Sequence, residues 1–198
     1  AWASATRRSH PLLEVRGDAG LQWSITLPRD VDDPADPVVR QMGFAALRAL
    51  GMDDGIATVE WFRRPDGSAL ISRVSSRPPD KHTFSLMGLS HGADMYRAWA
   101  NTVVNGVFGP IPRAFASGVA FVRGQGEGDV VASVEGWEAL REQLGDLVAD
   151  AFMPTPGQKR GMTPEGEGYV LVKHEETARV DEALARIRNE VIVRMRRS

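Results

Sequence analysis

The sequence predicts an α+β protein, with an antiparallel sheet lobe followed by a small α+β C-terminal domain. Two runs rich in β-branched and aromatic residues, 56–63 and 69–74, flank the turn signal Pro65-Asp66-Gly67-Ser68 and indicate a β-hairpin. Residues 105–112, NGVFGPIP, then interrupt all periodicity with glycines and prolines. Beyond them, short strand patterns alternate with helix patterns. We therefore expect two domains, 1–108 and 109–198.

Composition excludes several functional classes. With 198 residues, of which 42% are hydrophobic, the chain can form a buried core. The formal net charge of −2 gives no electrostatic argument for binding nucleic acid or an anionic membrane. The absence of cysteine excludes disulfides and thiolate chemistry. No apolar run approaches the ~20 residues that span a bilayer, and no signal peptide is recognisable. We predict a cytoplasmic protein that binds neither nucleic acid nor membranes.

Before the hairpin, the sequence predicts an irregular lead-in, a strand and a helix, over residues 1–20, 21–27 and 36–50. Asp36 followed by proline is a good helix start, and Gly51 is a good stop. After the hairpin, two prolines impose extended backbone, and helices are predicted over 83–89 and 94–104. The intervening residues, Asp80 to His82, are interpreted as a solvated loop, with the wall of a substrate pocket as the alternative.

The C-terminal part is expected to contain four strands and two helices. The strands are predicted at 114–122, 129–134, 147–153 and 169–174, and the helices at 134–144 and 177–195. Thr177 is a plausible N-cap of the second helix. The glycine-rich link 124–128 lacks a following helix that could hold an anion, so it is interpreted as a long hairpin turn. Residues 155–168, rich in glycine and proline, predict an exposed loop.

The hairpin turn decides which residues of its two strands face each other. A loop of two or four residues pairs Glu60 with Arg73, whereas a loop of three or five residues shifts the pairing by one. Because side chains alternate between faces, Arg73, Ser75 and Arg77 then stand in a row opposite Glu60. By itself, a cross-strand Glu–Arg pair is a common feature of sheets, worth about 0.2–1 kcal/mol.

The pattern around this pair resembles the ATP-grasp ligases. In that family an acid in one strand is followed, after a turn, by acid-x-Asn-x-Arg in the next strand, and these residues form the metal and phosphate edge of the site. Glu60 takes the place of the first magnesium-binding acid. Arg73, Ser75 and Arg77 occupy the acid, asparagine and arginine positions. The segments LGMDDGIATVEWFRRPDGSALIS and RPP are similar to sequences of a carboxylate–amine ligase branch of the family. The resemblance covers residues 21–198.

The resemblance implies the C-terminal portion of an ATP-dependent carboxylate–amine ligase that forms an acyl phosphate. ATP and Mg²⁺ would be its cofactors, and a small carboxylate and an amine its substrates. The implied metal ligands are Glu60 and Ser75. Arg73 and Arg77 are the implied catalytic and nucleotide-binding residues, since a planar guanidinium can hold a phosphate or carboxylate by two parallel hydrogen bonds.

Arg73 is the main departure from the family pattern. Two carboxylates ~4 Å apart repel by roughly 4 kcal/mol at an effective dielectric constant of about 20, and so favour a bound cation. Glu60 facing Arg73 has the opposite charge balance, which predicts impaired metal binding. The alternative function is therefore a non-catalytic, ATP-grasp-derived binding or scaffold module, a pseudoenzyme. The glycine-rich loop and lysines of a nucleotide site are not in this sequence, so the chain alone is not expected to be competent. Homodimerisation stays open.

Overall fold

The structure, a computed structural model, describes residues 3–29, 36–52, 55–109 and 111–198. The chain divides into two compact units. The first consists of Ala1–Ala5 and Asp30–Arg113, and the second of Thr6–Arg29 and Ala114–Ser198. This division differs from the predicted domains 1–108 and 109–198, because the segment 6–29 supplies strands to the sheet of the second unit.

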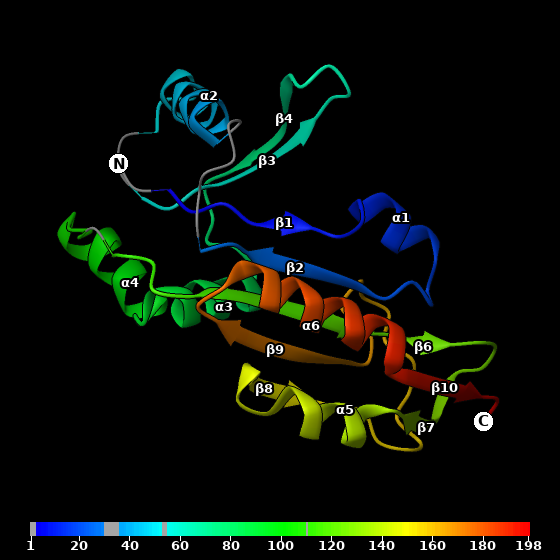
Figure 1. The fold of residues 1–198 in the computed structure, drawn as a ribbon. Coiled ribbons are helices and arrows are strands. Elements are labelled where there is room, and N and C mark those ends of the chain that lie inside the picture. Colours follow the sequence, from blue (N-terminus) through cyan, green and yellow to red (C-terminus); the bar gives the residue numbers. More distant parts are fainter. Residues whose placement is uncertain (1–2, 30–35, 53–54, 110) are drawn as a thin grey trace. The chain divides into compact units, whose positions relative to one another are not determined.

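The first unit contains the predicted hairpin and helices (Figure 1). Its elements are α2 (Asp36–Ala49), β3 (Thr58–Arg63), β4 (Ala69–Ser75), α3 (Lys81–His91) and α4 (Met95–Asn105). The prediction of a solvated loop from Asp80 to His82 is wrong. The Asp80 carboxylate caps α3 by accepting hydrogen bonds from the backbone N–H groups of His82 and Thr83, each at 3.0 Å, and His82 is buried. Because of this cap, the helix begins at Lys81, two residues earlier than the hydrophobic pattern indicated.

The C-terminal end of α3 is hydrogen-bonded to the segment that follows α4. The imidazole of His91 is buried, and its Nδ1 lies 3.0 Å from the carbonyl oxygens of both Ile111 and Pro112. Burial lowers the pKa of His91, which favours a neutral ring whose Nδ1–H donates to these carbonyls. Helices α3 and α4 also meet through an edge-to-face contact between Phe84 and Tyr96, whose ring centroids are 4.9 Å apart.

A five-stranded antiparallel sheet forms the centre of the second unit, with the order β1-β2-β5-β9-β8. Its strands are β1 (Arg7–Arg8), β2 (Trp23–Leu27), β5 (Ala116–Val122), β8 (Val148–Phe152) and β9 (Gly168–His174). Every residue of β2 and β5 is buried. The predicted strands are confirmed, whereas the predicted irregular lead-in is not, because it contains β1 and α1 (Leu12–Gly17).

A second sheet in the same unit has the order β6-β10-β7. It consists of β6 (Gly124–Gln125), β7 (Val130–Glu135) and β10 (Ile192–Arg196). The predicted helix 177–195 is therefore too long. It ends at Glu190 as α6 (Thr177–Glu190), because the β-branched residues Ile192 and Val193 pair with β7 and β6 instead of continuing the helix. Pairing partners far away in the sequence overrode the local periodicity.

The glycine-rich link 124–128 is not the predicted hairpin turn, because β5 and β7 belong to different sheets. Its glycines let β10 approach closely. A Cβ built on Gly124 would lie 2.3 Å from the Sδ of Met195, and one on Gly128 would lie 2.3 Å from the carbonyl oxygen of Arg196. Gly128 also has a φ of +136°, which L-residues with a side chain rarely adopt.

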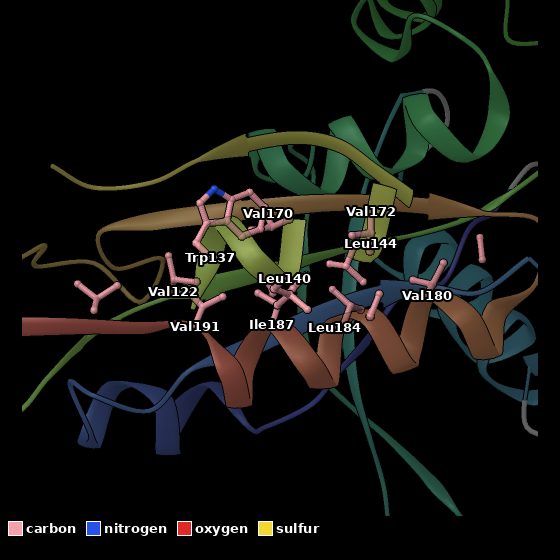
Figure 2. Packing of buried hydrophobic residues seen from close by; sticks show 14 of the residues in the cluster. Val122, Trp137, Leu140, Leu144, Val170, Val172, Val180, Leu184, Ile187 and Val191 are labelled. Atoms are coloured by element: carbon pink, nitrogen blue, oxygen red, sulfur yellow. The ribbon is translucent and has the colours of Figure 1, made fainter. Parts of the chain in front are cut away.

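Helix α6 covers one face of the large sheet, α5 (Trp137–Leu144) packs beside α6, and the short 3₁₀ helix η1 (Gly145–Leu147) follows α5. Figure 2 shows their apolar side chains gathered with those of β5 and β9 in one buried cluster. Burying each large aliphatic side chain contributes roughly 1.5–3 kcal/mol, so this cluster holds the helices on the sheet. No described helix has the length and apolar character needed to cross a membrane.

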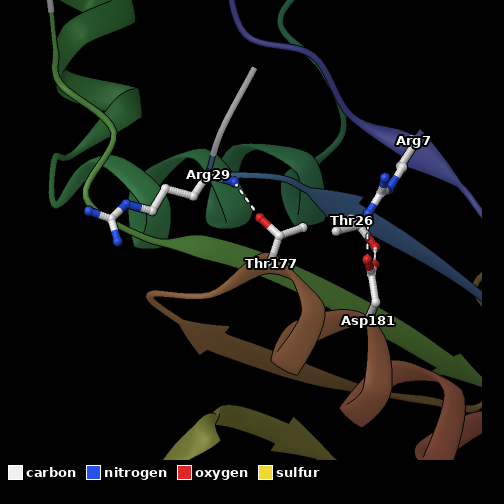
Figure 3. A network of polar contacts seen from close by, with 5 residues as sticks. All are labelled: Arg7, Thr26, Arg29, Thr177 and Asp181. Atoms are coloured by element: carbon white, nitrogen blue, oxygen red, sulfur yellow. Dashed lines mark hydrogen bonds and ion pairs between the residues drawn. The ribbon is translucent and has the colours of Figure 1, made fainter. Parts of the chain in front are cut away.

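Polar contacts fix the start of α6 against the edge of the sheet (Figure 3). The Asp181 carboxylate accepts hydrogen bonds from Arg7 and, at 3.0 Å, from the Thr26 hydroxyl. The Thr177 hydroxyl accepts from the backbone N–H of Arg29 at 3.1 Å. Thr177 is therefore not the N-cap, a position held by Glu176 without a side-chain capping bond. The segment 6–29 thus contacts helix α6 in addition to pairing with strand β5.

Candidate functional site

The β3–β4 hairpin places Glu60 directly opposite Arg73, as the sequence predicts. Directly opposed residues of an antiparallel pair project from the same face with Cβ atoms about 4.5–5.5 Å apart. Two residues further along, Ser75 is opposite Thr58 and shares that face. Glu60 and Ser75 are half-buried, whereas Arg73 is exposed. The structure therefore brings a carboxylate, a guanidinium and a hydroxyl together on one face.

This pairing arises differently from the prediction. The loop between the strands has five residues, and it is closed by a hydrogen bond of 2.8 Å from the Arg64 N–H to the Ser68 carbonyl oxygen. An odd loop shifts the pairing near the turn, where Trp61 is opposite Ile71. Ser72 is then an extra residue in β4, and this β-bulge restores the pairing of Glu60 with Arg73.

The remaining candidate, Arg77, lies beyond the strand. β4 ends at Ser75, and Arg77 is an exposed residue in the following bend. Its carbonyl oxygen accepts a hydrogen bond of 3.2 Å from the Thr58 hydroxyl, which holds this part of the chain next to the start of β3. The predicted row of side chains therefore runs through Arg73 and Ser75 and is interrupted before Arg77.

The side chains on this face do not by themselves fit Mg²⁺. Magnesium prefers near-octahedral coordination by hard oxygen atoms, usually including one or two carboxylates and several waters. Here Glu60 supplies one carboxylate, Ser75 supplies a neutral hydroxyl, and Arg73 introduces a positive charge opposite the carboxylate. Among the described residues there is also no group of three or more His, Cys, Asp or Glu side chains placed to hold a metal ion.

The turn that carries this hairpin is well fixed. The Asp66 carboxylate accepts a hydrogen bond of 2.8 Å from the Ser68 N–H, and contact with Ser68 lowers the pKa of Asp66. Gly67 has a φ of +83°, as this turn requires. The Arg63 guanidinium lies 5.9 Å from the centroid of the Trp61 ring, within cation–π range. The exposed end of the hairpin is therefore ordered by its own residues.

A buried polar cluster in the second unit was missed by sequence reasoning. Arg123 and Glu167 are only 6% and 4% exposed. The Arg123 guanidinium donates to the carbonyl oxygens of Val15, Asp18 and Leu21 at 2.8, 2.8 and 3.1 Å. Burial lowers the pKa of Arg123, and the Glu167 carboxylate opposes that shift. The cluster joins segments far apart in the sequence, so no local pattern indicates it.

Arg160 determines what the glycine-rich link can bind. Its guanidinium donates to the carbonyl oxygens of Gly128, Gly124 and Gly126 at 3.0, 3.1 and 2.7 Å. The link therefore presents three carbonyl oxygens, and not N–H groups, to the Arg160 guanidinium, which is the reverse of a phosphate loop. A cavity of 480 Å³ beside it is lined by Ala19, Arg160, Arg197 and residues 126–129.

Comparison with known proteins identifies the fold of the chain. The sequence matches no protein-family model and no curated protein. Solved structures nevertheless show that the chain has the α+β ATP-grasp fold over part of the length of known enzymes, which confirms the predicted fold class.

Three solved structures illustrate this likeness. L-amino acid ligase from Bacillus licheniformis matches with a TM-score of 0.72 and 17% identity, over 87% of this chain and 44% of that chain. Phosphoribosylglycinamide synthetase from Anaerococcus prevotii matches with a TM-score of 0.64 and 15% identity, over 87% of this chain and 45% of that chain. N5-carboxyaminoimidazole ribonucleotide synthetase from Thermotoga maritima matches with a TM-score of 0.62 and 15% identity, over 87% of this chain and 46% of that chain. This chain thus spans less than half the length of each of these proteins.

Proposed function

We propose that this chain is the C-terminal portion of an ATP-grasp carboxylate–amine ligase whose β3–β4 hairpin binds the phosphates of ATP. The observation that carries the proposal is the opposition of Glu60 and Arg73 on one face of the hairpin. The fold shared with an L-amino acid ligase supports the reaction class. Formation of an acyl phosphate and its transfer to an amine are proposed for the protein that contains this chain. A cytoplasmic location and homodimerisation stay predictions.

The chain's own residues can supply fixed positive charge. Transfer of a phosphoryl group to a carboxylate spreads negative charge over the phosphate oxygens, and preorganised cations stabilise that charge. Arg73 and Arg77 would bind these oxygens, and Glu60 would orient Arg73 from the opposite strand. Ser75 would donate or accept one auxiliary hydrogen bond. Because the donor set does not fit Mg²⁺, we propose no step that depends on a metal held by Glu60 and Ser75.

A non-catalytic binding or scaffold module is the second candidate. It is favoured by Arg73, because an internal ion pair with Glu60 can stabilise the hairpin without any ligand. In that case the fold would be retained while turnover is lost. The two candidates differ in whether ATP is consumed, and not only in whether it binds.

The test is a titration of the full-length protein with ATP, with and without Mg²⁺, followed by an assay for ADP and for acyl phosphate trapped by hydroxylamine. We expect ATP to bind without Mg²⁺, and Arg73→Gln to weaken binding about tenfold through loss of a charge-assisted contact. Arg63→Gln, a change at another arginine of the same hairpin, is the matched control and should have little effect.

The outcomes separate the two candidates. ADP formation that depends on a carboxylate substrate supports the ligase, and ATP binding without turnover supports the scaffold module. Arg73→Glu creates a second acid opposite Glu60 and should make nucleotide binding depend on Mg²⁺. If circular dichroism shows that the protein is folded and it binds no ATP under any condition, a nucleotide role for the hairpin is contradicted.

A further inference from the structure

A cavity of 400 Å³ lies beside β8, the last strand of the five-stranded sheet. It is lined by Trp137, Arg141, Met153 and the four consecutive residues 148–151. Side chains of consecutive strand residues point to opposite faces of a sheet. Since four consecutive residues line the same cavity, the cavity follows the backbone edge of β8 and not one of its faces.

This edge is open to pairing. β8 pairs with β9 on one side, and no described strand pairs with its other side. Neither proline nor lysine, the residues that commonly block an exposed edge, occurs within its sequence, VADAF. Ala149 is an extra residue in the pairing with β9 and forms a β-bulge, which leaves its backbone outside the regular ladder. The edge therefore offers backbone donors and acceptors to an additional strand.

The charges at the cavity indicate the chemistry of that strand. Arg141 is exposed, and within the described part of the chain its side chain makes no hydrogen bond or ion pair. The nearby Asp150 carboxylate already accepts a hydrogen bond of 2.9 Å from the Tyr169 hydroxyl, and this contact raises the pKa of Tyr169. Asp150 keeps its negative charge but is held by Tyr169, whereas Arg141 is a cation without a partner among the described residues, so a carboxylate is the group that Arg141 can bind.

The apolar part of the cavity is supplied by Trp137 and Met153. Trp137 is 6% exposed and belongs to the buried cluster of the unit, so its ring is a fixed wall. Trp137 and Arg141 are four residues apart on α5 and therefore lie on the same side of the helix. An apolar side chain and a carboxylate close together in one extended segment would meet both residues.

We propose that the open edge of β8 binds an extended peptide that carries a carboxylate next to an apolar residue. The peptide backbone pairs with β8 as a further strand, the carboxylate binds Arg141, and the apolar side chain packs on Trp137. A second copy of this chain fits less well. Two β8 strands paired symmetrically about Asp150 would place two aspartates opposite each other. The proposal does not depend on nucleotide binding by the hairpin.

The experiment selects binders to the complete chain from a phage-displayed library of random linear peptides. We expect enriched sequences with β-branched or apolar residues beside Asp or Glu. One enriched peptide is then synthesised with a fluorescent label and titrated by anisotropy. Arg141→Gln should weaken its binding about fivefold or more, through loss of one charge pair. Arg179→Gln, at an exposed arginine on α6, is the matched control and should not change it.

Chemical variants of the same peptide test the backbone pairing without altering the protein. N-methylation at alternate backbone nitrogens keeps the side chains but removes donors, so binding should be lost. Enrichment without an acidic consensus, equal binding to the Arg141→Gln protein, or full binding of the N-methylated peptide would each overturn the proposal. So would sedimentation data that show a dimer disrupted by Ala151→Lys, because the edge would then belong to a second copy.

Discussion

Single residues decide how closely the elements of the second unit approach each other. Gly118 in β5 lies under α6, and a Cβ built on it would be 2.5 Å from Leu184 Cδ1 and 3.0 Å from Val180 Cγ1. Protein interiors pack at close to crystalline density, so one added methyl group has no free space here. Gly17 in α1, in contrast, has no atom within 4 Å of the same position.

The first prediction follows from this contrast. Gly118→Ala should destabilise the protein by about 1–3 kcal/mol, because the helix has to shift to accept the methyl group. Gly17→Ala is the control and should be neutral or slightly stabilising. Urea unfolding monitored by tryptophan fluorescence measures both changes. Equal stability of the two variants would show that α6 packs less tightly on β5 than the contacts indicate.

At the scale of elements, helix α3 depends on the cap that the sequence pattern placed in a loop. The Asp80 carboxylate accepts hydrogen bonds from two backbone N–H groups and, at 2.8 Å, from the Thr83 hydroxyl. These bonds satisfy amides that have no partner within the helix. The cap, three residues after Arg77, also fixes the start of α3.

Asp80→Ala should therefore cost about 1 kcal/mol of stability, the usual value for a lost N-cap. The control is Ser85→Ala in the same helix, where the hydroxyl donates to the carbonyl oxygen of Lys81 one turn earlier and caps no backbone N–H of the first turn. Hydrogen exchange of the first-turn amides of α3 measures the local effect. If those amides exchange at unchanged rates in the Asp80 variant, the capping bonds contribute little.

At the scale of the whole molecule, each half of the sequence contributes to the second unit. β2 pairs with β5 over its full length, and Trp23 stacks on Phe121 with ring centroids 4.6 Å apart. The predicted domain 109–198 lacks β2 and would expose the buried edge of β5. An exposed apolar edge strand favours aggregation.

We therefore expect the fragment 109–198 to be aggregated or poorly folded. A fusion that joins residues 6–29 to residues 114–198 through a flexible linker should give a monomer with a dispersed ¹H–¹⁵N spectrum. Size-exclusion chromatography and NMR of the two polypeptides measure the difference. A well-folded monomeric 109–198 fragment would support the domain boundary predicted from the sequence.

The sequence by itself determined the hairpin, most helices and strands, and the opposition of Glu60 and Arg73. These features depend on turn residues and on alternation within a few positions, which are local properties of the chain. Even there, the pairing relied on a five-residue loop and a bulge at Ser72 whose shifts cancel, which alternation alone does not reveal.

Only the tertiary structure decided which strands share a sheet, that β10 replaces the end of the predicted helix, and that Arg123 is buried beside Glu167. It also decided that β8 ends the sheet with Arg141 beside its open edge. Each of these features joins residues that are distant in the sequence. Their energies come from packing and hydrogen bonds between distant segments, so the local pattern of residues does not predict them.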